Sequence, residues 1–266
     1  MNKGLIGYTG FIGRNLQSQQ KDFDALYNSK NISEIEGKTF DILYCAGISG
    51  VKWKARQNPK EDWEAIERLL SALKKVKARQ FILISTVDIY SNPTNVNEDS
   101  EAGNSQCAYG KHRYEAEKFL ASHFPEVFIF RLPGLFGTGL KKNIIYDFLH
   151  NQPAHIHHAS VAQFYDLARL SQDIHLAVGH ALQLVNLVTE PVPVQTIARQ
   201  VFGHEFENVP TASPELYDVH TKHADIYGHA GHYIMPKSSV LQSIQRFVNE
   251  ERASSTSNNE VIRMVG

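Results

Sequence analysis

A glycine-spaced loop near the N-terminus constrains the fold of this chain more than any other feature. The apolar pair Leu5-Ile6 runs directly into Gly7-Tyr8-Thr9-Gly10-Phe11-Ile12-Gly13, after which a helical pattern begins. The three glycines permit a tight strand-to-helix turn, a close approach of the backbone to a pyrophosphate, and close packing of helix on strand. Thr9 is a candidate cap for that helix, whose free N–H groups and dipole favour phosphate. In this context the loop predicts a dinucleotide site, and a plain tight turn is the alternative.

Short apolar runs alternate with helical patterns over most of the chain. Strands are predicted at residues 4–7, 24–28, 41–46, 80–86, 126–132 and 182–188. Helices are predicted at residues 61–77 and 108–122, where apolar side chains recur every three or four positions, and also at residues 144–149 and 194–202. Several strands are continuously apolar, as strands buried on both faces of a sheet are. The alternation predicts an α/β protein with a Rossmann-type, doubly wound parallel sheet.

The predicted elements divide the chain into a large core and a small second region. Residues 1–137 form the dinucleotide-binding core, which strand and helix elements around residues 160–190 complete. Residues 138–160 and 190–252 are left for a small C-terminal substrate-binding region. Residues 253–266 begin with a Ser/Asn-rich stretch and are expected to form a mobile tail.

The charge balance and the cysteine content exclude several classes of protein. There are 27 Lys and Arg against 28 Asp and Glu, without a basic tract, so no nucleic acid partner is expected. No apolar stretch approaches the ~20 residues that a membrane helix needs, and the N-terminus does not resemble a secretory signal. The two cysteines, Cys45 and Cys107, do not make a disulfide scaffold. We therefore expect a cytoplasmic protein without membrane contact.

Polar side chains of the kinds that serve in catalysis lie at and after the end of the predicted strand at residues 80–86. This strand ends in Ser85-Thr86, and ligands of parallel sheets lie outside the carboxyl ends of the strands. A polar loop then leads to Tyr109 and Arg113, which open the next predicted helix. Residues four apart share one helical face, so these two side chains should point to the same side while Lys111 points away.

The order of these motifs resembles that of one enzyme family. The matching segments are the glycine loop and residues 41–47, 58–59, 85–90, 109–113 and 131–137. In this series the chain is similar to the extended short-chain dehydrogenase/reductase family, in its NAD-dependent epimerase/dehydratase branch of nucleotide-sugar enzymes. The resemblance covers residues 4 to 137 and is thin beyond residue 140.

The resemblance implies the roles of three residues. Tyr109 would be the general acid/base that exchanges a proton with a sugar hydroxyl or ketone, and Thr86 would hydrogen-bond the same oxygen. The family normally places a lysine four residues after the tyrosine, where it assists the tyrosine and holds the nicotinamide ribose; here that residue is Arg113. Because arginine is longer and planar, either Arg113 takes the role of the lysine or the protein binds cofactor with weakened catalysis. We favour the first.

The cofactor is expected to be NADP in preference to NAD. The acidic residue that usually binds the ribose 2′-hydroxyl after the second strand is replaced by Asn28, Ser29 and Lys30, which suit a 2′-phosphate, although a solvated turn is the alternative. The residues expected to bind the cofactor are Gly7, Thr9, Gly10, Phe11, Ile12, Gly13, Asn28, Ser29, Lys30, Ala46, Gly47 and Arg113.

The residue after Thr86 bears on the reaction class. Sugar 4,6-dehydratases of the family carry Thr-Asp-Glu there, whereas Val87 cannot exchange a proton. Dehydration is therefore disfavoured, and we expect hydride transfer to or from a nucleotide-activated sugar, by a 4-ketoreductase or an epimerase. The rivals are a non-catalytic NAD(P)-binding sensor or partner protein and a reductase of a non-sugar ketone.

Further candidates lie on the substrate side. Beside Thr86 and Tyr109, the substrate-binding residues are expected to include Lys142 and Asn143, which precede a helix and suit a nucleotide diphosphate; an ordinary solvated pair is the alternative. The clustered histidines are His155, His157, His158, His220, His223, His229 and His232. With no cysteine nearby, we expect loop or surface histidines rather than a metal site. A homodimer through the helices at 61–77 and 108–122 is compatible with their apolar faces.

Overall fold

A six-stranded parallel sheet forms the centre of the structure, a computed structural model that describes the backbone of residues 1–265 and the side chains of residues 1–254. Across the sheet the strands are β10 (Leu184–Asn186), β6 (Val127–Leu132), β4 (Lys77–Thr86), β3 (Thr39–Cys45), β1 (Lys3–Ile6) and β2 (Ala25–Tyr27). Since β2 and β3 lie on opposite sides of β1, the strand order reverses between β1 and β3, where ligands of doubly wound sheets bind. The predicted fold class is confirmed.

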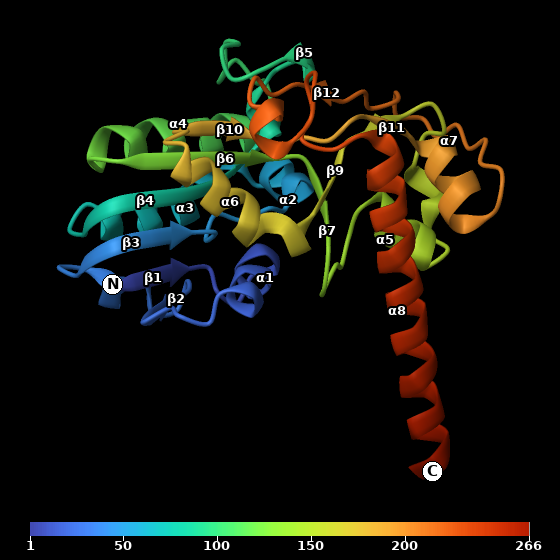
Figure 1. The fold of residues 1–266 in the computed structure, drawn as a ribbon, viewed down its shortest axis with the longest axis horizontal. Helices are drawn as coiled ribbons and strands as arrows, with labels where there is room; N and C mark the ends of the chain where they lie inside the picture. The colour runs from blue at the N-terminus through green and yellow to red at the C-terminus, as the bar shows by residue number, and fades with distance from the viewer. Residues whose placement is uncertain (266) are drawn as a thin grey trace.

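Helices cover both faces of the sheet (Figure 1). On one face α1 (Phe11–Gln19) and α6 (Leu170–Gly179) pack over Ile82 and Ile84 of β4. On the other face α3 (Pro59–Leu73) and α4 (Ala108–His123) pack over Phe81 and Leu83. Successive side chains of a strand point to opposite faces, so the continuous apolar run of β4 fills both cores.

The predicted boundaries differ from the observed ones at several ends. The helix expected to reach residue 77 ends at Leu73, and β4 begins at Lys77, three residues before the predicted strand. The helix expected at 194–202 is α7 (Val194–Ile197) continued by one wide turn, η5 (Ala198–Phe202). The link between β2 and β3 contains only η1 (Ile32–Ile35), since it is too short for a full crossover helix.

Short elements gather beyond the carboxyl ends of the sheet strands (Figure 1). They are η2 (Val87–Ile89), β5 (Thr94–Val96), β7 (Gly134–Phe136), α5 (Ile144–Leu149), η3 (Pro153–His155), β8 (Val161–Ala162), β9 (Phe164–Asp166), η4 (Leu167–Arg169), β11 (Val192–Pro193), β12 (Asp218–Val219) and η6 (Ala224–Tyr227). Three two-stranded ladders hold them together: β7 with β9, β8 with β11, and β5 with β12. That residues 138–160 and 190–252 bind substrate stays a prediction.

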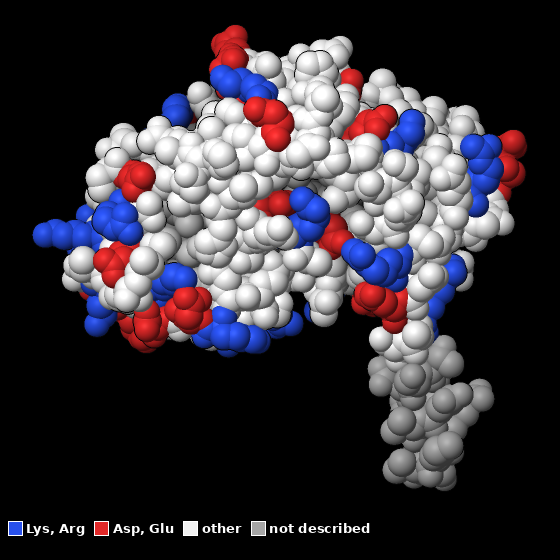
Figure 2. Space-filling view, in the orientation of Figure 1, with Lys and Arg blue, Asp and Glu red and all other residues white. Residues whose placement is uncertain are grey.

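The last helix, α8, spans Lys237–Val265. Most of the expected tail at 253–266 is therefore helical in its backbone, while Gly266 lies outside the described residues and the mobility of the segment stays a prediction. Within the described part of the chain, no helix combines the length and the apolar character needed to cross a membrane. On the face shown in Figure 2, acidic and basic side chains are interspersed and neither sign dominates.

A buried polar network ties α4 to the sheet. The carboxylate of Glu117 in α4 accepts hydrogen bonds from Arg131 of β6, at 2.7 Å from Nη2 to Oε2, and from Ser85 of β4. Arg131 also donates to the Tyr90 hydroxyl at 2.8 Å, which Asn186 of β10 meets at 3.1 Å. Because Glu117 and Arg131 are both almost fully buried, each depends on the other for compensation of its charge.

Replacing Glu117 by Gln leaves the buried Arg131 guanidinium without its counter-charge. We expect the free energy of unfolding to fall by about 3–5 kcal/mol, measured by urea denaturation. The matched control is Glu115→Gln in the same helix, which removes an exposed ion pair with Lys118 and should cost less than about 1 kcal/mol. Equal, small losses in the two variants would contradict the clamping role of Glu117.

Candidate active site

The glycine loop is packed tightly between β1, β3 and α1. Gly7 has a φ of +88°, and the Gly10 N–H donates to its carbonyl at 2.9 Å. A Cβ on Gly7 would stand 2.4 Å from the Ala46 carbonyl oxygen, and one on Gly13 would stand 2.0 Å from the Gly7 oxygen. Only glycine therefore fits at these two positions. The packing brings Ala46 and the loop together, as expected of one cofactor site.

The start of α1 has backbone donors available for a ligand. Its N-cap is Gly10 and no side chain caps it, so the prediction that Thr9 caps this helix was wrong. Arg14 is the first helical residue whose N–H bonds a carbonyl, that of Gly10 at 3.0 Å. The N–H groups before it have no acceptor among the described residues, and no acidic side chain lies in the first turn. This arrangement fits a dinucleotide pyrophosphate.

The polar turn after β2 lies next to the glycine loop, because β2 pairs with β1. The Asn28 side chain is used within the turn, where its Oδ1 accepts from the Lys30 N–H at 2.8 Å. Ser29 and Lys30 are exposed, and the structure records no ion pair for Lys30 within the described residues. The positions expected to contact the adenosine ribose are thus at the correct sheet edge, and their contact with cofactor stays a prediction.

Thr86 and Tyr109 meet at the carboxyl end of β4. The first turn of α4 is pressed against the backbone after Thr86, since a Cβ on Gly110 would stand 2.0 Å from the Asp88 carbonyl oxygen. Burial raises the pKa of Tyr109 to about 12, although the charge of Arg113 and a hydrogen bond with Thr86 both act to lower it. Tyr109 is thus a buried, neutral phenol in contact with Thr86. Lys111 is exposed on the other side of the helix, as predicted.

Arg113 shares the face of Tyr109, as the spacing predicted, but its donors are used within the protein. Its guanidinium carbon lies 4.0 Å from the centre of the Tyr109 ring. Nη1 donates to Asp62 and to the Tyr109 carbonyl, and Nη2 donates to Asp62 at 2.8 Å and to the Ser49 carbonyl at 2.6 Å. All four terminal N–H groups are therefore engaged. Only Nε is without a partner among the described residues.

Asp62, in the first turn of α3, is the residue that sequence reasoning missed here. Its carboxylate also contacts His112 Nδ1 at 2.8 Å. Burial acts to raise the pKa of Asp62, but the hydrogen bonds from Arg113 and His112 outweigh it and the pKa is lowered. In the sequence, an acidic residue in a first helical turn is explained by the helix dipole alone, so nothing singled Asp62 out.

The two residues predicted to bind the diphosphate of the substrate, Lys142 and Asn143, have different surroundings. The Lys142 ammonium donates to the Gly50 carbonyl at 2.7 Å, and its pKa is lowered by partial burial and by the charge of Arg113. Lys142 and Arg113 thus bind neighbouring backbone carbonyls, those of Gly50 and Ser49. Asn143 is the N-cap of α5: its Oδ1 accepts from the N–H groups of Ile145 and Tyr146, and its Nδ2 donates to Leu135. This capping role was not predicted, and substrate contact by either residue stays a prediction.

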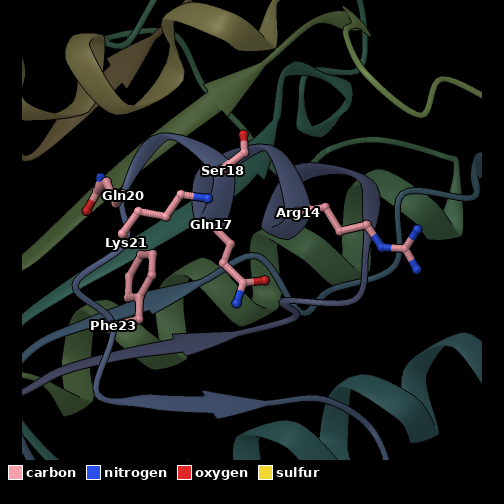
Figure 3. A pocket seen from close by; sticks show the side chains of 6 residues that line it. All are labelled: Arg14, Gln17, Ser18, Gln20, Lys21 and Phe23. Carbon is pink, nitrogen blue, oxygen red and sulfur yellow. The ribbon is translucent and has the colours of Figure 1, made fainter.

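Two other features lie apart from these residues. A shallow hollow of about 310 Å³ runs along α1 and the link after it, lined by Arg14, Gln17, Ser18, Gln20, Lys21 and Phe23 (Figure 3). It contains none of the candidate site residues. Among the clustered histidines, His220 and His232 stack at 4.6 Å, and in the described part of the chain no three metal-ligating side chains form a group.

Comparison with known proteins assigns the chain to a family. The model of the NAD dependent epimerase/dehydratase family matches residues 25–166, more than half of the chain. The chain belongs to this family. The matched residues contain Thr86, Tyr109 and Arg113, whereas the glycine loop precedes them. No curated protein matches the sequence of the chain.

Solved structures of epimerases and reductases share the fold at low identity. A UDP-glucose 4-epimerase from Thermotoga maritima has a TM-score of 0.71 at 14% identity, over 96% of this chain and 99% of its own. A dTDP-4-dehydrorhamnose reductase from Clostridium acetobutylicum has a TM-score of 0.70 at 14% identity, over 95% and 100%. MoeE5 in complex with UDP-glucose and NAD reaches 0.75 at 14% identity, over 96% and 99%. These likenesses show that the chain shares the fold of these proteins over 95–96% of its length.

Replacing Asp62 by Asn removes the counter-charge of the buried Arg113. We expect the free energy of unfolding at pH 7 to fall by about 3–5 kcal/mol, measured by urea denaturation. An acid with a lowered pKa stabilises above its unfolded pKa of about 3.9 and loses this effect as the pH falls through the folded value. The difference between wild type and Asp62→Asn should therefore shrink below about pH 4.

The control is Asp99→Asn, which removes an exposed ion pair with Lys222 and should change stability by less than about 1 kcal/mol. A difference between wild type and Asp62→Asn that is as small as the control's at pH 7 would show that Asp62 does not compensate Arg113.

Proposed function

We propose that this protein is an NAD(P)-dependent reductase of a nucleotide-activated 4-keto sugar. The observation that carries the proposal is the pairing of Thr86 with a neutral, buried Tyr109 at the carboxyl end of β4, two strands from the glycine loop on β1. In a parallel sheet this edge holds the ligand, so a dinucleotide on the loop reaches toward the same phenol. Family membership supports the cofactor class and the sugar-nucleotide substrate.

The cofactor would lie across the reversal of strand order. The glycine loop and the open start of α1 would hold the pyrophosphate, with Ala46 and Gly47 beneath it. Ser29 and Lys30 support NADP over NAD, because an exposed lysine without an acidic partner within the described residues suits a 2′-phosphate. When bound, the nicotinamide supplies the hydride that adds to the carbonyl carbon of the substrate.

The protonation state of Tyr109 supports reduction as the direction of catalysis. Reduction of a ketone needs a proton for the developing alkoxide, and Tyr109 can donate one while Thr86 hydrogen-bonds the same oxygen. Oxidation of an alcohol, with which an epimerase cycle begins, needs a base, whereas burial raises the pKa of Tyr109 and favours the protonated phenol. This favours a ketoreductase, and an epimerase that uses the same two residues is the alternative.

Dehydration needs both an acid and a base beside the tyrosine. Of the two residues that follow Thr86, Val87 has no exchangeable proton, so the Asp88 carboxylate would have to serve alone. On the substrate side, the Lys142 ammonium has a neutral carbonyl as its one hydrogen-bond partner among the described residues, which supports a contact with the phosphates of the sugar nucleotide. A homodimer through α3 and α4 stays a proposal, and the buried apolar side chains of these helices already pack against the sheet.

One observation favours a second candidate function, a non-catalytic NAD(P)-binding sensor. The terminal N–H groups of Arg113 are all engaged by Asp62 and by backbone carbonyls, so only Nε–H is left for the nicotinamide ribose that the family's lysine holds. A sensor needs tight cofactor binding without turnover. An assay that measures both NADPH binding and NADPH turnover with keto-sugar nucleotides separates the two functions.

Replacing Tyr109 by Phe removes the proton donor but keeps the ring against Arg113. We expect the oxidation of NADPH by UDP- and dTDP-linked 4-keto-hexoses to slow by roughly 100- to 10,000-fold, with the dissociation constant of NADPH unchanged. The wild-type rate of reduction should stay level from about pH 7 to about pH 10, because the phenol stays protonated. NADPH should serve better than NADH.

The matched control is Tyr114→Phe in the same helix, which should turn over at the wild-type rate. Equal rates for Tyr109→Phe and wild type would contradict the assigned acid. Tight binding of NADPH with no turnover of any member of the panel would establish the sensor instead.

A further inference from the structure

Three side chains that the proposed mechanism does not use form a closed hydrogen-bonded triangle at the site. The Lys52 ammonium, at the start of α2 (Lys52–Gln57), lies 2.7 Å from Asp88 Oδ1 and 2.7 Å from the Tyr217 hydroxyl. The Tyr217 hydroxyl donates to the same Oδ1 at 2.6 Å. The three residues come from parts of the chain up to 165 positions apart, so folding alone brings them together.

The triangle lies beside the proposed catalytic pair. Asp88 follows Thr86 by two residues, and its N–H donates to the Thr86 hydroxyl at 3.2 Å. Its carbonyl lies against Gly110, the neighbour of Tyr109, and its carboxylate charge acts on the Tyr109 phenol. A substrate carbonyl held by Thr86 and Tyr109 therefore has this triangle at its side.

The chain holds Tyr217 firmly in this place. The Tyr217 N–H donates to the Val161 carbonyl at 3.0 Å, and the next residue, Asp218, pairs with Thr94 in the β5–β12 ladder. Burial and the negative charges of Asp88 and Glu215 raise the pKa of Tyr217 well above its usual value. The phenol is therefore a fixed neutral donor to Asp88.

The triangle retains hydrogen-bonding capacity for a ligand. Both donors go to Oδ1 of Asp88, and Oδ2 accepts no hydrogen bond from the described residues. The Lys52 ammonium has three N–H groups, of which these contacts use two. The side chains of Asp88 and Lys52 are 21% and 26% exposed, so a ligand can reach them. A carboxylate oxygen and an ammonium N–H side by side suit neighbouring hydroxyl groups, which both donate and accept.

We propose that Lys52, Asp88 and Tyr217 form the binding subsite for the sugar hydroxyls of the substrate, with Tyr217 holding the Asp88 carboxylate in the orientation that accepts from the sugar. The subsite rests on the proposed function, since it presumes a sugar nucleotide at Tyr109. It determines which hexose is bound and takes no part in proton transfer. The ligands of this subsite are hydroxylated pyranoses, and the nucleotide portion of the substrate binds outside the subsite.

The affinity added by the sugar is measured separately from the affinity of the nucleotide. Isothermal titration calorimetry of the NADPH-loaded protein with UDP, UDP-glucose, dTDP and dTDP-glucose gives this gain as the ratio of dissociation constants within each pair. No ketone is present, so the proposed reaction does not interfere. We expect Tyr217→Phe to reduce the gain roughly tenfold, because the carboxylate loses its orienting donor, and to leave UDP and dTDP binding unchanged.

The matched control is Tyr233→Phe, which removes another phenol–carboxylate hydrogen bond, at 2.5 Å to Asp218, from the same region but outside the triangle. It should keep the wild-type gain. Lys52→Met serves as a second variant should Tyr217→Phe unfold, and it should also lose the gain while UDP still binds.

The outcomes separate the subsite from the proposed function. A wild-type gain that persists in Tyr217→Phe and Lys52→Met overturns the subsite and leaves the proposed function intact. Wild-type protein that binds UDP or dTDP but gains nothing from glucose also overturns the subsite. Wild-type protein that binds neither nucleotide nor sugar nucleotide overturns the proposed function and the subsite with it.

Discussion

The contact between the Asp88 carbonyl and Gly110 is the constraint on which the candidate site depends. It presses the first turn of α4 against the end of β4 with no space for a side chain, since a Cβ at residue 110 would stand 2.0 Å from the carbonyl oxygen. Tyr109 is thereby fixed next to Thr86. Two turns further along α4, the buried Glu117–Arg131 pair holds the same helix on the sheet. The contact at Gly110 therefore fixes the position of the first turn of α4, and the Glu117–Arg131 pair stabilises the later part of the helix on the sheet.

Two ion pairs lie around Tyr109 and affect the chemistry that the site can perform. Asp62 compensates Arg113 and Lys52 compensates Asp88, so the charges of Arg113 and Asp88 that act on the phenol are each paired. A cation lying over the Tyr109 ring would favour the phenolate, but burial outweighs it and the pKa rises to about 12. Arg113 stands where the family usually has a lysine, and Asp62 binds its planar guanidinium with two parallel hydrogen bonds. The arginine at this position therefore depends on Asp62.

Local patterns in the sequence predicted the core and part of the site. The glycine spacing predicted the turn at Gly7, and the spacing of Tyr109 and Arg113 predicted their common face. Contacts between distant segments carry no such pattern, so Asp62 and Tyr217 were missed. The prediction that Thr9 caps α1 was wrong because Gly10 occupies the N-cap. The structure also shows that Asn143 caps α5, a role that was not predicted but that its place before a short helix permits; its contact with substrate stays a prediction.

The most direct test of the central claim follows the hydride itself. The protein is incubated with NADPH deuterated at C4 of the nicotinamide, in separate R and S forms, and with a UDP- or dTDP-linked 4-keto-hexose, and the product is analysed by mass spectrometry and NMR. A reductase built on Thr86 and Tyr109 should transfer deuterium from only one of the two forms, to the former carbonyl carbon of the sugar. Product without deuterium from either form, or no product from any sugar nucleotide while NADPH binds, would contradict the account.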